Sequence, residues 1–63
     1  MQKNARQFTQ DATTELKHAI ECLQSALETV EKPQNHEKIE QALQACQTAY
    51  NQTNQTANIL EQE

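Results

Sequence analysis

Glycine is absent from this chain of 63 residues, and proline occurs only once, as Pro33. These two residues supply most of the backbone conformations that tight turns require. Because the chain has almost no turn chemistry, a fold of many short strands is disfavoured and a few long elements are expected. The absence of glycine also excludes the glycine-rich loops that bind phosphate groups.

Cysteine and aromatic residues are scarce as well, with two Cys, one Tyr, one Phe and no Trp. Two cysteines are too few for a disulfide framework, and no segment resembles a secretory signal. No apolar run approaches the roughly 20 residues that cross a bilayer. We therefore expect a soluble, cytoplasmic protein with reduced thiols. A peripheral membrane protein is not expected, because the helices lack a cationic face and large apolar anchors.

Positive charge is in short supply, since five Lys and Arg residues oppose nine Asp and Glu residues and the formal net charge is −4. Residues 1–20 carry a balance of +1, from Lys3, Arg6 and Lys17 against Asp11 and Glu15, so the acidic excess lies in the rest of the chain. Nucleic acid is not the partner that this balance favours.

What the chain does contain is a seven-residue repeat of apolar and small side chains. One row, named a, consists of Thr9, Leu16, Leu23 and Val30 in the first half, and of Ile39, Cys46, Thr53 and Leu60 in the second. A second row, named d, consists of Ala5, Ala12, Ala19 and Ala26, and then of Ala42, Ala49 and Thr56. Spacings that alternate between three and four residues are typical of a coiled-coil seam. They predict two helices, at about 4–32 and about 35–61.

The single proline explains why the pattern breaks between the two halves. Pro33 biases Lys32 away from helical geometry, so we predict a turn at 32–35 with Asn35 as the N-cap of the second helix. So short a connection makes the helices antiparallel neighbours. The predicted fold is a single all-α domain, 1–63, an alanine-rich two-helix hairpin. In this hairpin, two residues face each other when their residue numbers sum to 65. Each such pair then joins a large side chain to a small one: Ile39 with Ala26, Leu23 with Ala42, Cys46 with Ala19, Leu16 with Ala49, and Leu60 with Ala5.

The rows that flank the seam bear on assembly. Position e is apolar on both helices, and we name its residues the e strip: Ile20, Leu27, Leu43, Tyr50 and Ala57. Three apolar positions per heptad are typical of a helix that is buried on more than one side. The strip therefore predicts a homodimer in which two hairpins form a four-helix bundle. On the other flank, at position g, Phe8 and Ile59 are expected to hold the two termini together. The amide-rich stretch 51–58 is interpreted as helix, with disorder as the alternative.

Few residues are candidates for catalysis or for metal binding. His18 and Cys22 are four apart and face one metal position, but two ligands do not complete a tetrahedral site. Cys46 is interpreted as a small apolar residue of the seam. Cys46 has no orienting base, and the many carboxylates lie on exposed helix faces without a pocket. We predict no catalytic residue, no metal and no cofactor, and therefore no enzyme.

The sequence alone does not fix a function, and two hypotheses stand. The first is a protein–protein interaction module, a homodimeric hairpin acting as a regulator, adaptor or chaperone whose e strip binds either itself or another protein's helix. The second is RNA or DNA binding. In length, heptads and short turn the chain resembles the plasmid repressor-of-primer family, whose hairpins dimerise into four-helix bundles and bind paired RNA loops. That resemblance implies a binding face on the first helix, where the comparable residues are Lys3, Arg6, Phe8, Gln10 and Lys17.

Overall fold

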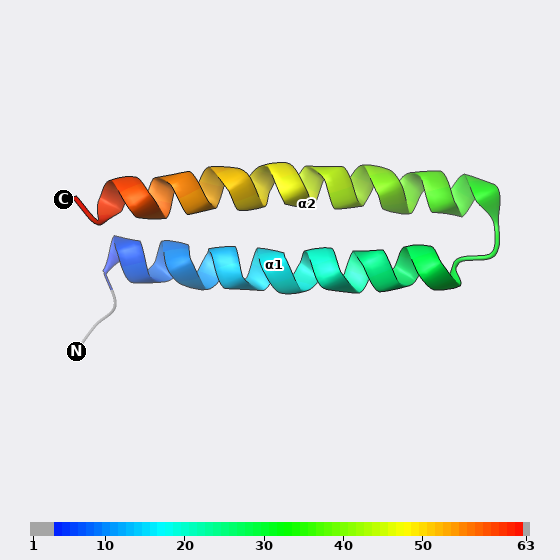
Figure 1. Ribbon diagram of the computed structural model, residues 1–63, viewed down its shortest axis with the longest axis horizontal. Helices are drawn as coiled ribbons and strands as arrows, with labels where there is room; N and C mark the ends of the chain where they lie inside the picture. The colour runs from blue at the N-terminus through cyan, green and yellow to red at the C-terminus, as the bar shows by residue number, and fades with distance from the viewer. Residues whose placement is uncertain (1–3, 63) are drawn as a thin grey trace.

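The chain folds as two long antiparallel helices. The computed structural model describes residues 4–62, in which α1 (Ala5–Thr29) and α2 (Pro33–Leu60) lie side by side along their whole length (Figure 1). Within that range there is no strand, so the predicted all-α hairpin is confirmed. The molecule is elongated, with extents of 46 × 20 × 11 Å and a radius of gyration of 14.6 Å. A compact domain of this length would have a radius of gyration of about 10.6 Å.

The start of α1 is fixed by a reciprocal cap. The Gln7 backbone N–H donates to the Asn4 side-chain Oδ1 at 2.9 Å, and the Asn4 backbone N–H donates to Gln7 Oε1 at the same distance. This capping box satisfies two backbone donors that have no partner inside the helix. The spacing Asn4–x–x–Gln7 is the sequence signal for it, and it locates the helix start within one residue of the predicted position.

The connection between the helices differs in detail from the prediction. Helix α1 ends at Thr29 rather than near 32, and Val30 is extended with φ −71° and ψ 139°. The predicted N-cap Asn35 is wrong: Lys32 is the N-cap of α2 and Pro33 occupies the first helical turn. The Lys32 carbonyl accepts from the backbone N–H groups of Asn35 and His36, each at 3.0 Å. Proline suits this place because its fixed φ is helical and its missing N–H would have no partner there.

Threonines in the seam satisfy their hydroxyls within their own helix. Thr9 Oγ1 donates to the Ala5 carbonyl at 2.8 Å, and Thr53 Oγ1 donates to the Tyr50 carbonyl at 3.1 Å. Such bonds to the preceding turn let a polar residue occupy a packed position without an unpaired group. The stretch 51–58 is helical throughout, which confirms the helical interpretation over disorder.

The contact between the helices departs from the predicted a/d seam on α2, which is turned towards position e. All eight a residues are half-buried, and on α1 so are the e residues and the d residues Ala12, Ala19 and Ala26, whereas every described g residue is exposed. On α2 the e row is more buried than the d row, because Ala42 and Thr56 are exposed while Leu43 and Tyr50 are half-buried. Position e lies about 40° from a around the helix, and d lies about 60° away on the other side. Turning α2 in this way buries large side chains in place of Ala and Thr, which removes more apolar area from water.

Candidate interaction surface

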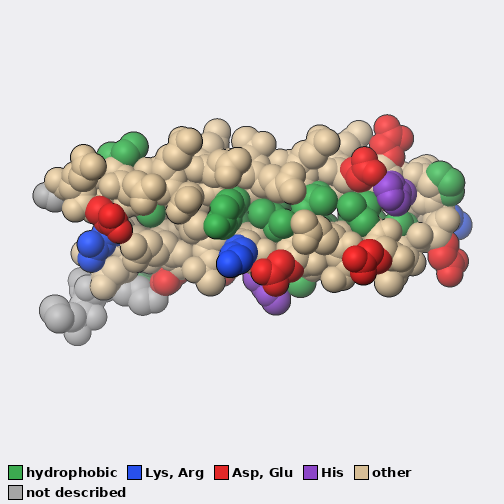
Figure 2. All heavy atoms as spheres, in the orientation of Figure 1, with side chains coloured by type: hydrophobic (Ala, Val, Ile, Leu, Met, Phe, Trp, Pro, Cys, Tyr) green, Lys and Arg blue, Asp and Glu red, His purple; other side chains and the backbone are tan. Residues whose placement is uncertain are grey.

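The e strip lines the groove between the helices on one face of the hairpin. Figure 2 shows this face, on which hydrophobic side chains gather along the line where α1 and α2 meet. Ile20 and Leu27 of α1 and Leu43 and Tyr50 of α2 are all half-buried. Each of these four side chains is thus covered in part by the facing helix and keeps a part of its surface towards solvent.

Ala57 is the exception among the five predicted interface residues. Its exposed fraction is 5%, and it is the one residue of 4–62 that is buried rather than half-buried or exposed. Since a side chain that is already buried has no area left for a second molecule, Ala57 belongs to the contact between α1 and α2. The prediction of an external interface, which the structure does not test, then depends on the other four residues of the e strip.

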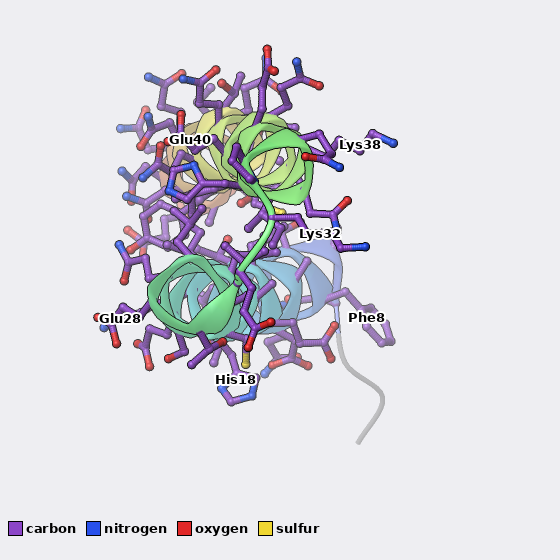
Figure 3. The ribbon with its side chains drawn as sticks, turned by 90° about the vertical axis from the view of Figure 1, so that its right-hand side faces the viewer. Phe8, His18, Glu28, Lys32, Lys38 and Glu40 are labelled. Carbon is purple, nitrogen blue, oxygen red and sulfur yellow. The ribbon has the colours of Figure 1, made fainter. Side chains whose placement is uncertain are left out.

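Acidic residues border the strip near the connection. Glu28 of α1 and Glu40 of α2 project from the same side of the hairpin (Figure 3), which is the side seen in Figures 1 and 2. His36 Nδ1 lies 3.1 Å from Glu40 Oε1, and both side chains are about half exposed. Lys38 projects from the opposite side of the molecule (Figure 3). The strip is thus bordered by negative charge at this end.

The open end of the hairpin carries Arg6, one of the two basic residues of α1. A shallow depression there is lined by Asn4, Ala5, Arg6, Leu60 and Glu61. It brings together the termini of both helices and places Ala5 beside Leu60, one of the predicted large-to-small pairs. Arg6 is half-buried at position e, where its Nε has no hydrogen-bond partner within the described part of the chain.

Phe8 and Ile59 lie on the other flank and do not bury one another. Their exposed fractions are 61% and 69%, and Phe8 points outward from the hairpin (Figure 3). The prediction that they hold the termini together is wrong. Both side chains occupy position g, and every described g residue is exposed because the helices meet through positions a, d and e.

Among the described residues comparable to the repressor-of-primer binding face, Phe8 lies apart from the others. Lys3 lies outside the described residues. Phe8 and Lys17 are nine positions apart on α1, which places them about half a turn from each other around the helix axis. Gln10 and Lys17 are exposed, but Arg6 is drawn into the open-end depression. Arg6, Gln10 and Lys17 lie within about 40° of one another around the axis of α1, so the set is divided between these three residues and Phe8.

The two thiols have different surroundings, and both are free. Cys46 is half-buried in the a row, in keeping with a packing role. Cys22 is exposed, and its Sγ lies 3.5 Å from Nε2 of His18, which is exposed one turn earlier and points away from α2 (Figure 3). Among residues 4–62 there is no group of three or more His, Cys, Asp or Glu side chains placed to hold a metal ion.

Comparison of the chain with protein-family models, with curated proteins and with solved structures found no match. Neither α1 nor α2 has the length and apolar character needed to cross a membrane. Any functional conclusion therefore rests on the surface of the hairpin itself.

Proposed function

We propose that the protein is a non-enzymatic interaction module that acts as a homodimer, in which two hairpins pack their e strips together as an antiparallel four-helix bundle. The observation that carries the proposal is the row of four large, half-exposed side chains in the groove: Ile20, Leu27, Leu43 and Tyr50. A helix pair that leaves such side chains at its surface is stabilised by a second apolar layer.

The amount of exposed surface supports a second copy. The accessible surface of the chain is 5071 Å². A monomeric globular protein of this mass, 7.2 kDa, would expose about 4100 Å². The excess, about 950 Å², is close to the roughly 800 Å² per partner that standard-size interfaces bury. The excess exposed surface of one hairpin is therefore large enough to form an interface with a second copy.

The small hydrophobic core of the hairpin also supports a homodimer. Only Ala57 is buried among the described residues, so a single hairpin has little packed interior to offset the loss of chain entropy. Two e strips facing each other would turn half-buried side chains into core residues. Each would then contribute a part of the roughly 1.5–3 kcal/mol that full burial of a large apolar side chain supplies.

Charge favours an antiparallel arrangement of the two hairpins. In the half nearer the connection, residues 19–46, five Glu oppose two Lys, whereas in the described part of the open half two basic residues oppose three acidic ones. A parallel dimer would bring the two more acidic halves together. The antiparallel dimer places the acidic half of one copy over the open half of the other, where Arg6 and Lys17 lie, and avoids that repulsion.

Sedimentation equilibrium of the intact protein tests the proposal. We expect the mass of a dimer at micromolar concentration, and a melting temperature that rises with protein concentration because dissociation accompanies unfolding. A mass of one chain together with a concentration-independent melting temperature would contradict the homodimer. The strip would then be left for the helix of a different protein.

A pair of double substitutions identifies the face. Ile20→Glu with Leu43→Glu should give a helical monomer, since two buried carboxylates on each copy are incompatible with the interface. The matched control is Phe8→Glu with Ile59→Glu, which places the same charges on the exposed opposite flank and should leave the dimer intact. Circular dichroism confirms helicity in both variants. Loss of the dimer in the control alone would assign the interface to the Phe8 and Ile59 flank.

A further inference from the structure

The His18–Cys22 pair on α1 has the geometry of half a metal site. The two side chains are one helical turn apart, both are exposed, and Cys22 Sγ lies 3.5 Å from His18 Nε2. Thiolate sulfur and imidazole nitrogen are the ligand types that Zn²⁺ prefers in proteins. The pair thus combines the right donors with open access from solvent.

The distance between the donor atoms fits a tetrahedral zinc ion. With Zn–S of about 2.3 Å and Zn–N of about 2.0–2.1 Å, a tetrahedral angle places the sulfur and nitrogen about 3.5–3.6 Å apart. The structure places the two atoms 3.5 Å apart in hydrogen-bond contact, and an ion would replace this contact at nearly the same separation. Because both donors belong to one regular helix, little further ordering is needed when the ion binds.

Two ligands leave two coordination positions open. No third His, Cys, Asp or Glu among residues 4–62 completes the site within one chain. His18 points away from α2 (Figure 3), so a second molecule can approach the pair without meeting the chain's own second helix. A second copy would bring an identical pair, and the two pairs together form the Cys₂His₂ set of structural zinc sites.

We propose that His18 and Cys22 bind Zn²⁺, or a similar thiophilic divalent cation, in a site that two copies of the chain complete. On binding, the Cys22 thiol releases its proton to solvent and the thiolate coordinates the ion. The site lies apart from the e strip, since Ile20 is about 160° from both residues around the axis of α1. It therefore goes beyond the proposed function and does not depend on it.

Zinc titration of the intact protein, kept reduced with a non-thiol reductant, tests the site. We expect one Zn²⁺ per two chains, with a mass at least twice that of the metal-free species and reversal by a chelator. Co²⁺ in place of Zn²⁺ should give a thiolate charge-transfer band and the strong visible bands of tetrahedral geometry. Absence of zinc retention would overturn the proposal, and so would one ion per chain without a change of mass.

Matched variants assign the ligands. Cys22→Ser and His18→Ala should each weaken zinc binding by more than the roughly 10–100-fold that loss of a supporting outer-shell group costs. The controls are Cys46→Ala and His36→Ala, which remove the other thiol and the other imidazole and should leave the stoichiometry and affinity unchanged. Zinc binding that survives Cys22→Ser, or that is lost in a control, would refute the assignment.

Discussion

Replacing Ala57 or Ala42 with leucine distinguishes the two ways in which the helices can face each other. Both alanines lie on α2, but Ala57 is 5% exposed at position e whereas Ala42 is exposed at position d. Leucine and alanine have similar helix propensities, so the substitution tests packing and little else.

The structure predicts opposite outcomes at the two positions. Ala57→Leu inserts three carbons where α1 already covers the side chain, and overpacking of this kind destabilises by about 1–3 kcal/mol. Each kcal/mol lowers the melting temperature of a domain this small by about 4–8 °C. Ala42→Leu adds the same atoms on an exposed surface, where substitutions usually stay within about 0.5 kcal/mol.

Thermal unfolding followed by circular dichroism measures both effects, with the variants compared at one protein concentration because the proposed dimer makes the melting temperature depend on it. A seam of the predicted a/d kind gives the reverse result. Ala42 would then face Leu23, and the larger leucine side chain at position 42 would destabilise the hairpin. A neutral Ala57→Leu beside a strongly destabilising Ala42→Leu would refute the rotation of the seam described above.

Two further predictions concern the helix starts, and both are read from melting temperature. Asn4→Ala removes the cap in which Asn4 and Gln7 exchange hydrogen bonds, and should destabilise by about 1 kcal/mol; Asn58→Ala, at an exposed position within α2, is the control. An unchanged melting temperature for Asn4→Ala would mean that the capping box does not hold in solution. Pro33→Ala should destabilise by about 0.4–1 kcal/mol, because alanine frees the unfolded chain at a position where proline already fits the helix. A stabilised variant would show that proline is strained there.

The hairpin could be predicted because the heptad pattern and the single proline act locally. Leu16, Leu23 and the alanines between them recur at helical spacing, and Pro33 marks the one place where that spacing breaks. The rotation of the helices about their own axes could not be read in the same way. Positions d, a and e together span only about 100° of the helix surface, so the pattern leaves open which edge of that arc faces the partner. That choice depends on the relative bulk of residues from both helices, such as Leu43 against Ala42.

The candidate surface, too, could be predicted from the sequence only in part. The e strip was recognisable as apolar from the sequence, yet only the way the two helices meet shows that Ala57 is buried and that Phe8 and Ile59 are exposed. The N-cap was missed for a local reason, because Asn35 and Lys32–Pro33 are both acceptable starts for a helix. The His18–Cys22 spacing was visible in the sequence, but only the structure shows that Sγ and Nε2 are in contact at 3.5 Å.

The two proposed contacts have a joint consequence, because they lie on opposite sides of α1. A dimer formed through the e strip is isologous and leaves one His18–Cys22 pair on each copy facing outward. A zinc ion shared between two pairs is a second isologous contact, with a different two-fold axis. Two such contacts on one chain form a closed assembly only when their axes intersect, and otherwise they extend into an open series. The ratio of one ion to two chains is the same in either case, whereas the mass is not. The ratio of zinc to chains therefore tests the metal site whether or not the e strip forms a dimer. A mass greater than that of two chains in the presence of zinc requires both contacts at once.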